Sequence, residues 1–181
     1  STSDRSRQVQ ANLDTWVNEG QGRRFNLIGH SQGGLDARYL AGALEDQRIV
    51  SVTTISSPHH GTPVADVTAG LVDITGVDSA YIELALSTLT SAIGVPTLDY
   101  VGQLSSLTTA GMEAFNVEVP NRDDVYYASW AGRSCSAIDW ACQTDNDGEI
   151  VAPYLGMTYW LIQVAAGDND GMCPVASAQW G

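Results

Sequence analysis

The feature that most constrains this chain is the segment at residues 25–34, FNLIGHSQGG. An apolar run leads into a Gly-x-Ser-x-Gly turn, and a helical pattern follows at once from Leu35. Strand, tight turn and helix in this order are typical of a nucleophile elbow, where a strained backbone projects a serine hydroxyl from a sheet. We expect Ser31 to be the nucleophile, and Gly29 and Gly33 to remove side chains that would otherwise collide in the turn. The alternative is a glycine-rich connection without chemistry.

Helical and strand patterns alternate along the first third of the chain. Apolar residues recur at helical spacing over residues 9–17 and 35–44, and strand patterns occupy residues 25–28 and 49–55. This rhythm predicts a doubly wound α/β fold with a mostly parallel sheet and helices on both faces. Residues 125–130 indicate a return to the sheet.

The pattern changes between these strands. Residues 64–116 hold helical signals broken by Gly and Pro, which indicates a helical insertion within one domain spanning residues 1–181. The insertion contains a weakly charged helix near residues 81–93. This helix is either a lid whose apolar face opens onto a lipid interface or a helix that faces the core.

Composition limits the classes of partner. A net charge of −13 argues against nucleic acid and anionic membranes. No stretch approaches the ~20 apolar residues that a membrane span needs. The start of the chain has no basic signal-peptide pattern, although a mature secreted protein would have lost it.

The three cysteines allow three different single disulfides, and the sequence alone does not choose among them. Cys135 and Cys142 are close enough in the chain to close a loop, which would leave Cys173 free. The spacing lacks the clustered His or Cys partners of a zinc site.

Several blocks of residues resemble the true bacterial lipases of the Pseudomonas/Burkholderia type. The most specific are the elbow block LIGHSQGGL and an Asn-Asp-Gly block near the end of the chain. The supporting matches are Ala37-Arg38-Tyr39, the run SVTTI at residues 51–55, Pro58-His59 and Gly61, with weaker ones at residues 107–110, 129–130 and Gly132. Together they extend from about residue 5 to residue 181.

The resemblance implies an α/β-hydrolase fold and a secreted serine hydrolase that cleaves carboxylic esters. Triacylglycerols are the expected substrate, and catalysis needs no cofactor. In that family the Asp of Asn-Asp-Gly is the acid of the Ser-His-Asp triad, which points to Asp170 rather than to Asp168. The backbone N–H of Gln32, the residue after Ser31, is the implied donor to the oxyanion.

Two parts of the family's pattern are missing from the sequence. The family's catalytic His follows the triad Asp, and a further oxyanion donor lies on an early His-Gly loop. The histidines here are His30, inside the elbow, and the pair His59 and His60, and all three precede Asp170. We therefore expect a middle portion of a larger hydrolase, nearly inert and poorly soluble alone, in which a complementary chain or segments supply the N-terminal strands and the catalytic His. If the chain were complete, His59 or His60 would be the base, although the Pro-His match implies a structural role.

The resemblance also concerns ions and other partners. The family holds a structural Ca²⁺ with an acid about twenty residues before the triad Asp, and counting back reaches Asp147 and Glu149. A solvated acidic turn is the alternative there. Family members often need a membrane-anchored folding helper.

Two alternatives to a triacylglycerol lipase stay open. One is another serine hydrolase on the same fold, such as a carboxylesterase, thioesterase, polyester depolymerase or acyltransferase. The other is a non-catalytic hydrolase-like domain that binds a partner.

Overall fold

The computed structural model describes residues 1–70, 87, 104–145 and 149–181. The chain divides into two compact units, and each is described by itself. The first unit comprises Ser1–His59, Ala114–Ala131 and Ala178–Gly181, and the second comprises His60–Glu113 and Gly132–Ser177.

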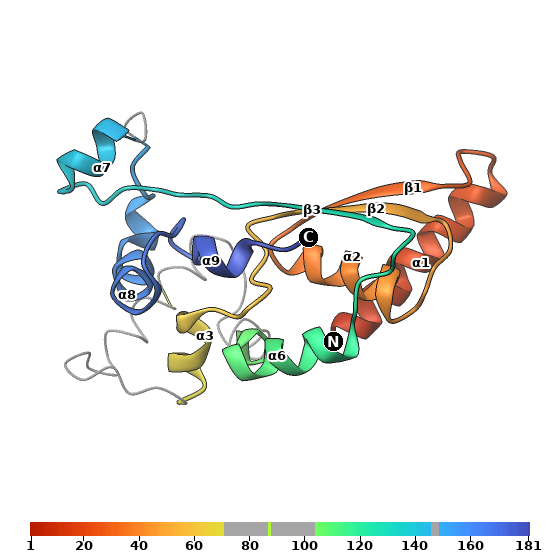
Figure 1. Ribbon diagram of the computed structural model, residues 1–181, viewed down its shortest axis with the longest axis horizontal. Helices are drawn as coiled ribbons and strands as arrows, with labels where there is room; N and C mark the ends of the chain where they lie inside the picture. The colour runs from red at the N-terminus through yellow and green to blue at the C-terminus, as the bar shows by residue number, and fades with distance from the viewer. Residues whose placement is uncertain (71–86, 88–103, 146–148) are drawn as a thin grey trace. The chain divides into compact units, whose positions relative to one another are not determined.

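The first unit is built on a parallel sheet of three strands in the order β1-β2-β3 (Figure 1). The strands are β1 (Phe25–His30), β2 (Ile49–Ile55) and β3 (Tyr126–Trp130). Leu27 pairs with Val52, and Val52 pairs with Tyr127, so these residues share one face of the sheet. All three strands run the same way, and their carboxyl ends therefore meet at one edge, where ligands bind in open α/β sheets.

Two helices accompany this sheet, α1 (Thr2–Asn18) and α2 (Gln32–Gly42). A capping box starts α1, because Ser1 and Asp4 bond reciprocally through side chain and backbone. Arg5 ties α1 to α2 through a bidentate pair with Asp36, at 2.7 and 2.8 Å. Between these helices and the sheet lies a core of Leu13, Ala37, Leu40, Ala41, Ile49, Val52 and Val125.

The opposite face of the sheet carries exposed apolar side chains. It carries Ile28, Tyr126 and Trp130, with exposed fractions of 74%, 71% and 68%.

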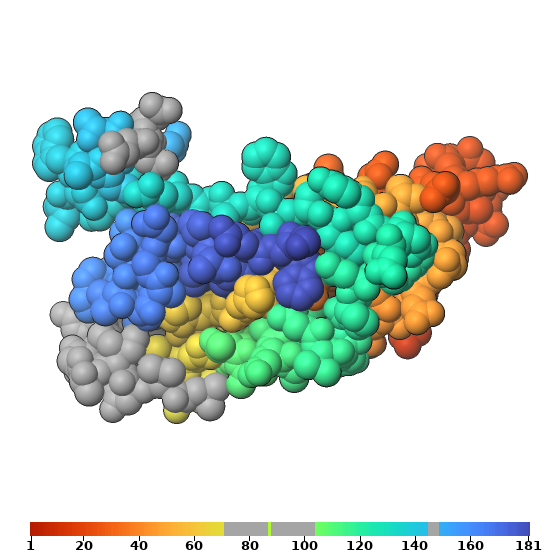
Figure 2. All heavy atoms as spheres, viewed as in Figure 1, coloured from red at the N-terminus to blue at the C-terminus, as the bar shows by residue number. Residues whose placement is uncertain are grey.

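The end of the chain crosses beside β3, where the Trp180 N–H donates to the Ser129 hydroxyl at 2.7 Å. Figure 2 shows this chain end, in dark blue, against the teal segment that contains β3.

The second unit is helical in the part that the structure describes. Its elements are α3 (Pro63–Thr68), η1 (Ser105–Leu107), α7 (Trp140–Asp145), η2 (Pro153–Leu155) and α8 (Gly156–Ala166), while α6 (Thr109–Glu118) and α9 (Val175–Ala178) begin in this unit and end in the first. Helix α3 packs against α8 and η1. A disulfide joins Cys135 to Cys142, and Cys173 is a buried free thiol.

The expected α/β class with a parallel sheet is confirmed. The described part of residues 64–116 contains helices, and the predicted lid helix near residues 81–93 lies, except for residue 87, outside the described residues. No helix among the described residues is long and apolar enough to cross a bilayer.

Candidate active site

Ser31 occupies the junction between β1 and α2 in a strained conformation, with φ 53° and ψ −127°. Two backbone hydrogen bonds hold the turn: the Ser31 N–H donates to the Ile55 carbonyl at 2.9 Å, and the Gly34 N–H donates to the Ser31 carbonyl at 3.1 Å. A serine that precedes a helix usually caps it with its hydroxyl, but this side chain makes no capping bond. The hydroxyl is therefore left available for chemistry at a position whose strain the surrounding structure must sustain.

The glycines of the turn are needed at positions that differ partly from those expected. A Cβ on Gly29 would lie 2.4 Å from the Gly33 carbonyl oxygen, so the prediction for Gly29 agrees with the structure. A Cβ on Gly33 would meet nothing within 4 Å, so the expected collision at Gly33 is wrong. The second close approach is at Gly34 instead, where a Cβ would lie 2.1 Å from the Ser57 hydroxyl oxygen. The sequence pattern did not reveal this, because Ser57 arrives from the far end of the neighbouring strand.

Gln32 is the first residue of α2, directly after Ser31. The first N–H groups of a helix have no acceptor within it, and the helix dipole adds partial positive charge there. A backbone N–H at this place is suited to stabilise negative charge that develops beside the Ser31 hydroxyl.

Asp170 lies in a tight loop of the second unit. Its Oδ1 accepts hydrogen bonds from the N–H groups of Met172 at 2.9 Å and Cys173 at 2.7 Å. Its own N–H donates to the Cys173 carbonyl at 3.3 Å. These backbone hydrogen bonds hold the Oδ1 oxygen of the Asp170 carboxylate in place.

The flanking residues explain why the motif reads Asn-Asp-Gly. Asn169 is fully buried, and its amide donates to the carbonyls of Tyr159 and Gly167 while its Oδ1 accepts from the Gly171 N–H at 2.8 Å. Gly171 has φ 96°, and a Cβ there would lie 2.9 Å from side-chain carbons of Leu155 and Val151. Both residues hold the loop that presents Asp170.

The neighbouring acid is placed differently. Asp168 has a side chain that is 52% exposed and pairs with Arg133 at 3.4 Å. Such an exposed ion pair is weak and leaves the carboxylate in water. Burial raises the pKa of the Cys173 thiol to about 12 and keeps it protonated, so this thiol is a poor nucleophile.

His59 has both ring nitrogens engaged within the first unit. It is fully buried, with Nδ1 3.0 Å from an Arg38 guanidinium nitrogen and Nε2 2.9 Å from the Thr54 hydroxyl. Because the guanidinium only donates, Nδ1 accepts and Nε2 carries the proton. The ring also stacks on Trp180, with centroids 5.4 Å apart. This arrangement favours the structural role that the Pro-His match implied.

Sequence reasoning assigned Arg38 no role beyond its place in the Ala37-Arg38-Tyr39 match. It is 1% exposed and packs against the rings of Trp180 and Phe115, at 3.5 and 5.2 Å from their centroids. Its guanidinium also donates to Asn116 Oδ1 and to the Val119 carbonyl. Burial lowers the pKa of Arg38 to about 10, so it remains a cation at neutral pH. The sequence signal for a buried role of Arg38 was a charged residue within the apolar helical pattern of residues 35–44.

The other predicted residues are placed as follows. His30 is the last residue of β1 and is exposed, and His60 is exposed with its backbone N–H donating to the Ser177 hydroxyl at 3.1 Å. Asp147 lies outside the described residues, and Glu149 is exposed. Among the described residues no three His, Cys, Asp or Glu side chains gather where they could hold a metal ion. Ser31 and Gln32 belong to the first unit, and Asp170 belongs to the second.

Known proteins share this pattern. Residues 1–93 match the family model described as palmitoyl protein thioesterase. The triacylglycerol lipase of Burkholderia plantarii is 40% identical over 103 residues, which cover 54% of this chain and 28% of that protein. The triacylglycerol lipase of Pseudomonas fragi is 38% identical over 130 residues, which cover 61% of this chain and 44% of that protein. The predicted resemblance to bacterial lipases is therefore confirmed, and the chain spans less than half the length of these two relatives.

Solved structures agree on the fold. A crystal structure of a Bacillus licheniformis lipase in its mature form matches with a TM-score of 0.62 at 20% identity, covering 99% of this chain and 62% of that one. At this identity the likeness concerns the fold alone. The chain thus belongs to the palmitoyl protein thioesterase family of α/β-hydrolases, and the bacterial triacylglycerol lipases that its motifs resemble are among its relatives.

Proposed function

We propose that this chain carries the nucleophile and the acid of a serine hydrolase that cleaves carboxylic esters, with triacylglycerols as substrates. The observation that carries the proposal is the backbone of Ser31, at φ 53° between a strand and a helix with no capping bond from its hydroxyl. A strained serine at this junction is the defining element of the nucleophile elbow. The names of the two lipase relatives support the choice of ester substrate.

Each residue has a separate role in the proposed reaction. The Ser31 hydroxyl attacks the ester carbonyl while a histidine takes its proton, and the Gln32 N–H receives the oxyanion. Asp170 holds that histidine in the required tautomer and stabilises its imidazolium. Hydrolysis of the acyl-enzyme by water then returns the Ser31 hydroxyl.

The proposed base is a histidine outside residues 1–181. His59 is unsuited to the role, because its nitrogens contact Arg38 and Thr54 and its side chain is fully buried. In α/β-hydrolases the base follows the acid along the chain, and no histidine follows Asp170 within these residues. Segments of a longer protein, or a complementary chain, would supply it.

The test is ester hydrolysis by the full-length protein and by Ser31→Ala, measured with p-nitrophenyl butyrate. Loss of a serine nucleophile lowers kcat by about 10⁶ in comparable enzymes, and we expect a loss of this order. Ser56→Ala is the matched control, because Ser56 also has a positive φ, 47°, at the end of a strand. It should retain activity. Equal losses in both variants would mean that folding rather than the nucleophile had been removed.

A second candidate is a thioesterase, which the matching family model favours. The same serine chemistry cleaves an acyl thioester, so the residue roles do not change. Comparing kcat/KM for an oxygen ester and a thioester of the same acyl chain separates the two. A non-catalytic domain would hydrolyse neither substrate.

Secretion is proposed on the evidence of one covalent bond. The disulfide between Cys135 and Cys142 is of a kind that persists in oxidising compartments and is rare in the cytosol. Finding the protein in culture medium, with this disulfide intact by mass spectrometry, would support the proposal.

A further inference from the structure

The two most exposed large apolar side chains in the described part of the second unit lie in one short loop. The disulfide between Cys135 and Cys142 closes this loop, whose last residues begin α7 (Figure 1). Inside it the side chains of Ile138 and Trp140 have exposed fractions of 87% and 79%. Residues 137–141 are all exposed, and four of these five are apolar. Such a run is unfavourable in water and indicates a binding surface.

The bonds within this disulfide loop hold it in one shape. The Asp139 carboxylate caps the start of α7 by accepting a hydrogen bond from the Cys142 N–H at 3.0 Å. The Gln143 side chain donates to the Ser136 carbonyl at 2.9 Å, and the Asp139 N–H donates to the same carbonyl at 3.1 Å. The disulfide further limits the conformations of the unbound loop. Little entropy is therefore lost when its apolar side chains bind a partner.

The charges in and around the disulfide loop limit what it can bind. Asp139 is the only charged residue in the sequence from residue 134 to residue 144, and its carboxylate is engaged as the cap of α7. Arg133, just before this stretch, pairs with Asp168 at 3.4 Å. The net charge of −13 repels anionic headgroups. The loop therefore suits an uncharged surface.

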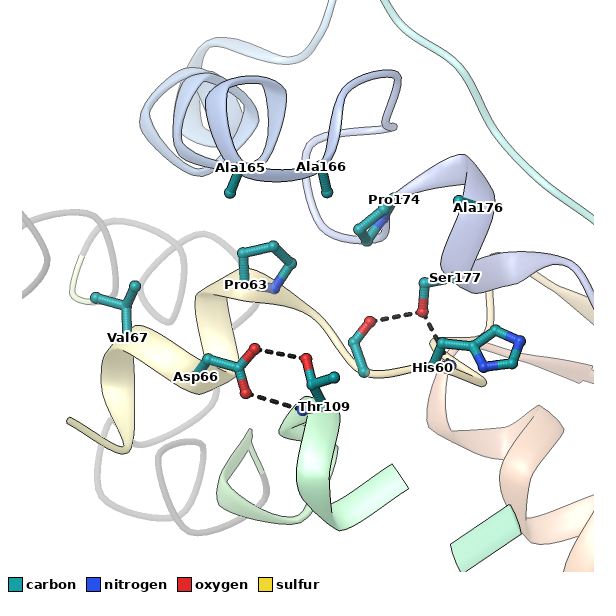
Figure 3. Close-up of a pocket in the computed structure, with 11 residues that line it drawn as sticks. His60, Pro63, Asp66, Val67, Thr109, Ala165, Ala166, Pro174, Ala176 and Ser177 are labelled. Carbon is teal, nitrogen blue, oxygen red and sulfur yellow. Dashed lines mark hydrogen bonds between the residues drawn. The ribbon is translucent and has the colours of Figure 1, made fainter. Parts of the chain in front are cut away.

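The disulfide loop is separate from the pocket of the same unit. That pocket has a volume of about 530 Å³, and Figure 3 shows Pro63 on one side of it, facing Ala165 and Ala166 on the other. Neither Ile138 nor Trp140 lines it. Their side chains extend into solvent instead, where a broad surface can meet both at once.

We propose that the disulfide loop anchors the protein to an uncharged lipid–water interface. Interfacial segments insert large apolar and aromatic side chains at the boundary between headgroups and acyl chains, where the indole N–H of a Trp keeps a polar partner. Protein interfaces surround their apolar centre with a polar rim that forms direct hydrogen bonds. Residues 137–141 offer one polar side chain, and the cap of α7 already engages it.

The lipid surface would be that of the aggregated ester substrate, and this assignment rests on the proposed function. The loop is distant in the sequence from residues 81–93, where a lid helix was predicted. Anchoring through Ile138 and Trp140 therefore needs no movement of that segment.

Binding is measured first, without catalysis. Full-length Ser31→Ala protein is mixed with phosphatidylcholine vesicles, and the bound fraction is measured by cosedimentation. Ile138→Ser and Trp140→Ser, each added to this background, should weaken binding by roughly tenfold, because one large apolar side chain no longer leaves water. Trp140→Phe keeps an aromatic ring and should retain most of the affinity. Val117→Ser is the matched control, since Val117 is 82% exposed on α6, outside the loop, and it should leave binding unchanged.

Three results would overturn the inference. The first is no vesicle binding by the Ser31→Ala protein, and the second is an equal loss of binding in Val117→Ser and Trp140→Ser. The third comes from sedimentation velocity without lipid: if Ile138→Ser lowers the mass of the sedimenting species, the loop joins two copies of the chain instead.

The active protein separates this inference from the proposed function. Ile138→Ser should leave kcat/KM for dissolved p-nitrophenyl butyrate unchanged and lower the turnover of an emulsified triacylglycerol. If vesicle binding depends on the loop but the wild-type protein hydrolyses no ester, the proposed function fails and the interfacial anchor stands. If esters are hydrolysed but vesicle binding does not depend on the loop, the anchor fails and the proposed function stands.

Discussion

Two adjacent glycines of the elbow should respond in opposite directions to the same substitution. A Cβ on Gly34 would lie 2.1 Å from the Ser57 hydroxyl oxygen and 2.9 Å from both the Ser57 Cβ and the Thr54 Cγ2. A Cβ on Gly33 would meet no atom within 4 Å. Gly34→Ala therefore overfills the contact between α2 and the end of β2, whereas Gly33→Ala places a methyl group in open space.

The size of the difference follows from these contacts. Rotating the Ser57 hydroxyl away removes the shortest contact, but the two carbon atoms at 2.9 Å remain inside the 3.4 Å at which ordinary contact begins. Helix and strand must then separate by several tenths of an ångström, and overpacking of this kind costs about 1–3 kcal/mol. Gly33 lies in the first turn of α2 without a positive φ, so Ala should stabilise there by up to about 1 kcal/mol. The two variants should differ by about 1–4 kcal/mol.

The assay is urea unfolding of the full-length protein, followed by tryptophan fluorescence, with both variants and the wild type at the same concentration. The free energy of unfolding should fall for Gly34→Ala and stay equal or rise for Gly33→Ala. Similar losses in both variants, or a larger loss at Gly33, would refute the packing described for the elbow.

Three further predictions test other parts of the structure. Asp170→Asn should lower kcat by about 10⁴, because the acid that fixes the tautomer of the histidine is lost, whereas Asp168→Asn should have little effect. Steady-state kinetics measures both, and a larger loss of kcat in Asp168→Asn would contradict the assignment. Arg38→Met should lower the free energy of unfolding by about 3 kcal/mol, because it leaves buried hydrogen-bond acceptors unpaired. An unchanged free energy in urea unfolding would contradict the hydrogen bonds described for Arg38. Hydrogen bonds from Arg48 lower the pKa of Asp46 to about 2 from its ordinary 3.8. The ionised carboxylate therefore stabilises the fold fully above about pH 4. Its contribution of about 2 kcal/mol is lost as the pH falls toward 2. Asp46→Asn should reduce the fall in the free energy of unfolding between about pH 4 and pH 2. An unchanged dependence of that free energy on pH would contradict the stabilising role of the Asp46 carboxylate.

The elbow was predictable because its signal is local. A strand, a Gly-x-Ser-x-Gly turn and a helix occupy consecutive residues, and the backbone of Ser31 follows from that order. The role of Gly34 was not predictable, because its partner Ser57 is brought alongside only when β2 pairs with β1. The same physical reason applies to Arg38, whose ring partner Trp180 lies at the other end of the chain.

The loop of Asp170 was found through its motif, and the structure supplies the physical cause of that motif. Asn169 is buried with its amide fully bonded, and Gly171 adopts a φ of 96° where a side chain would collide. The pocket lined by Pro63, Thr109, Ala166 and Pro174 had no sequence signal, because these residues come from four separate segments. Alanine and proline in such segments are too common to indicate a binding site.

The central claim is that Ser31 is a reactive nucleophile, and covalent labelling tests it most directly. The full-length protein is treated with an organophosphonate ester, digested and mapped by tandem mass spectrometry. We expect one phosphonate on the peptide that carries Ser31, and no label in Ser31→Ala. A label on another serine with Ser31 unmodified, at Ser56 or Ser57 for example, would contradict it.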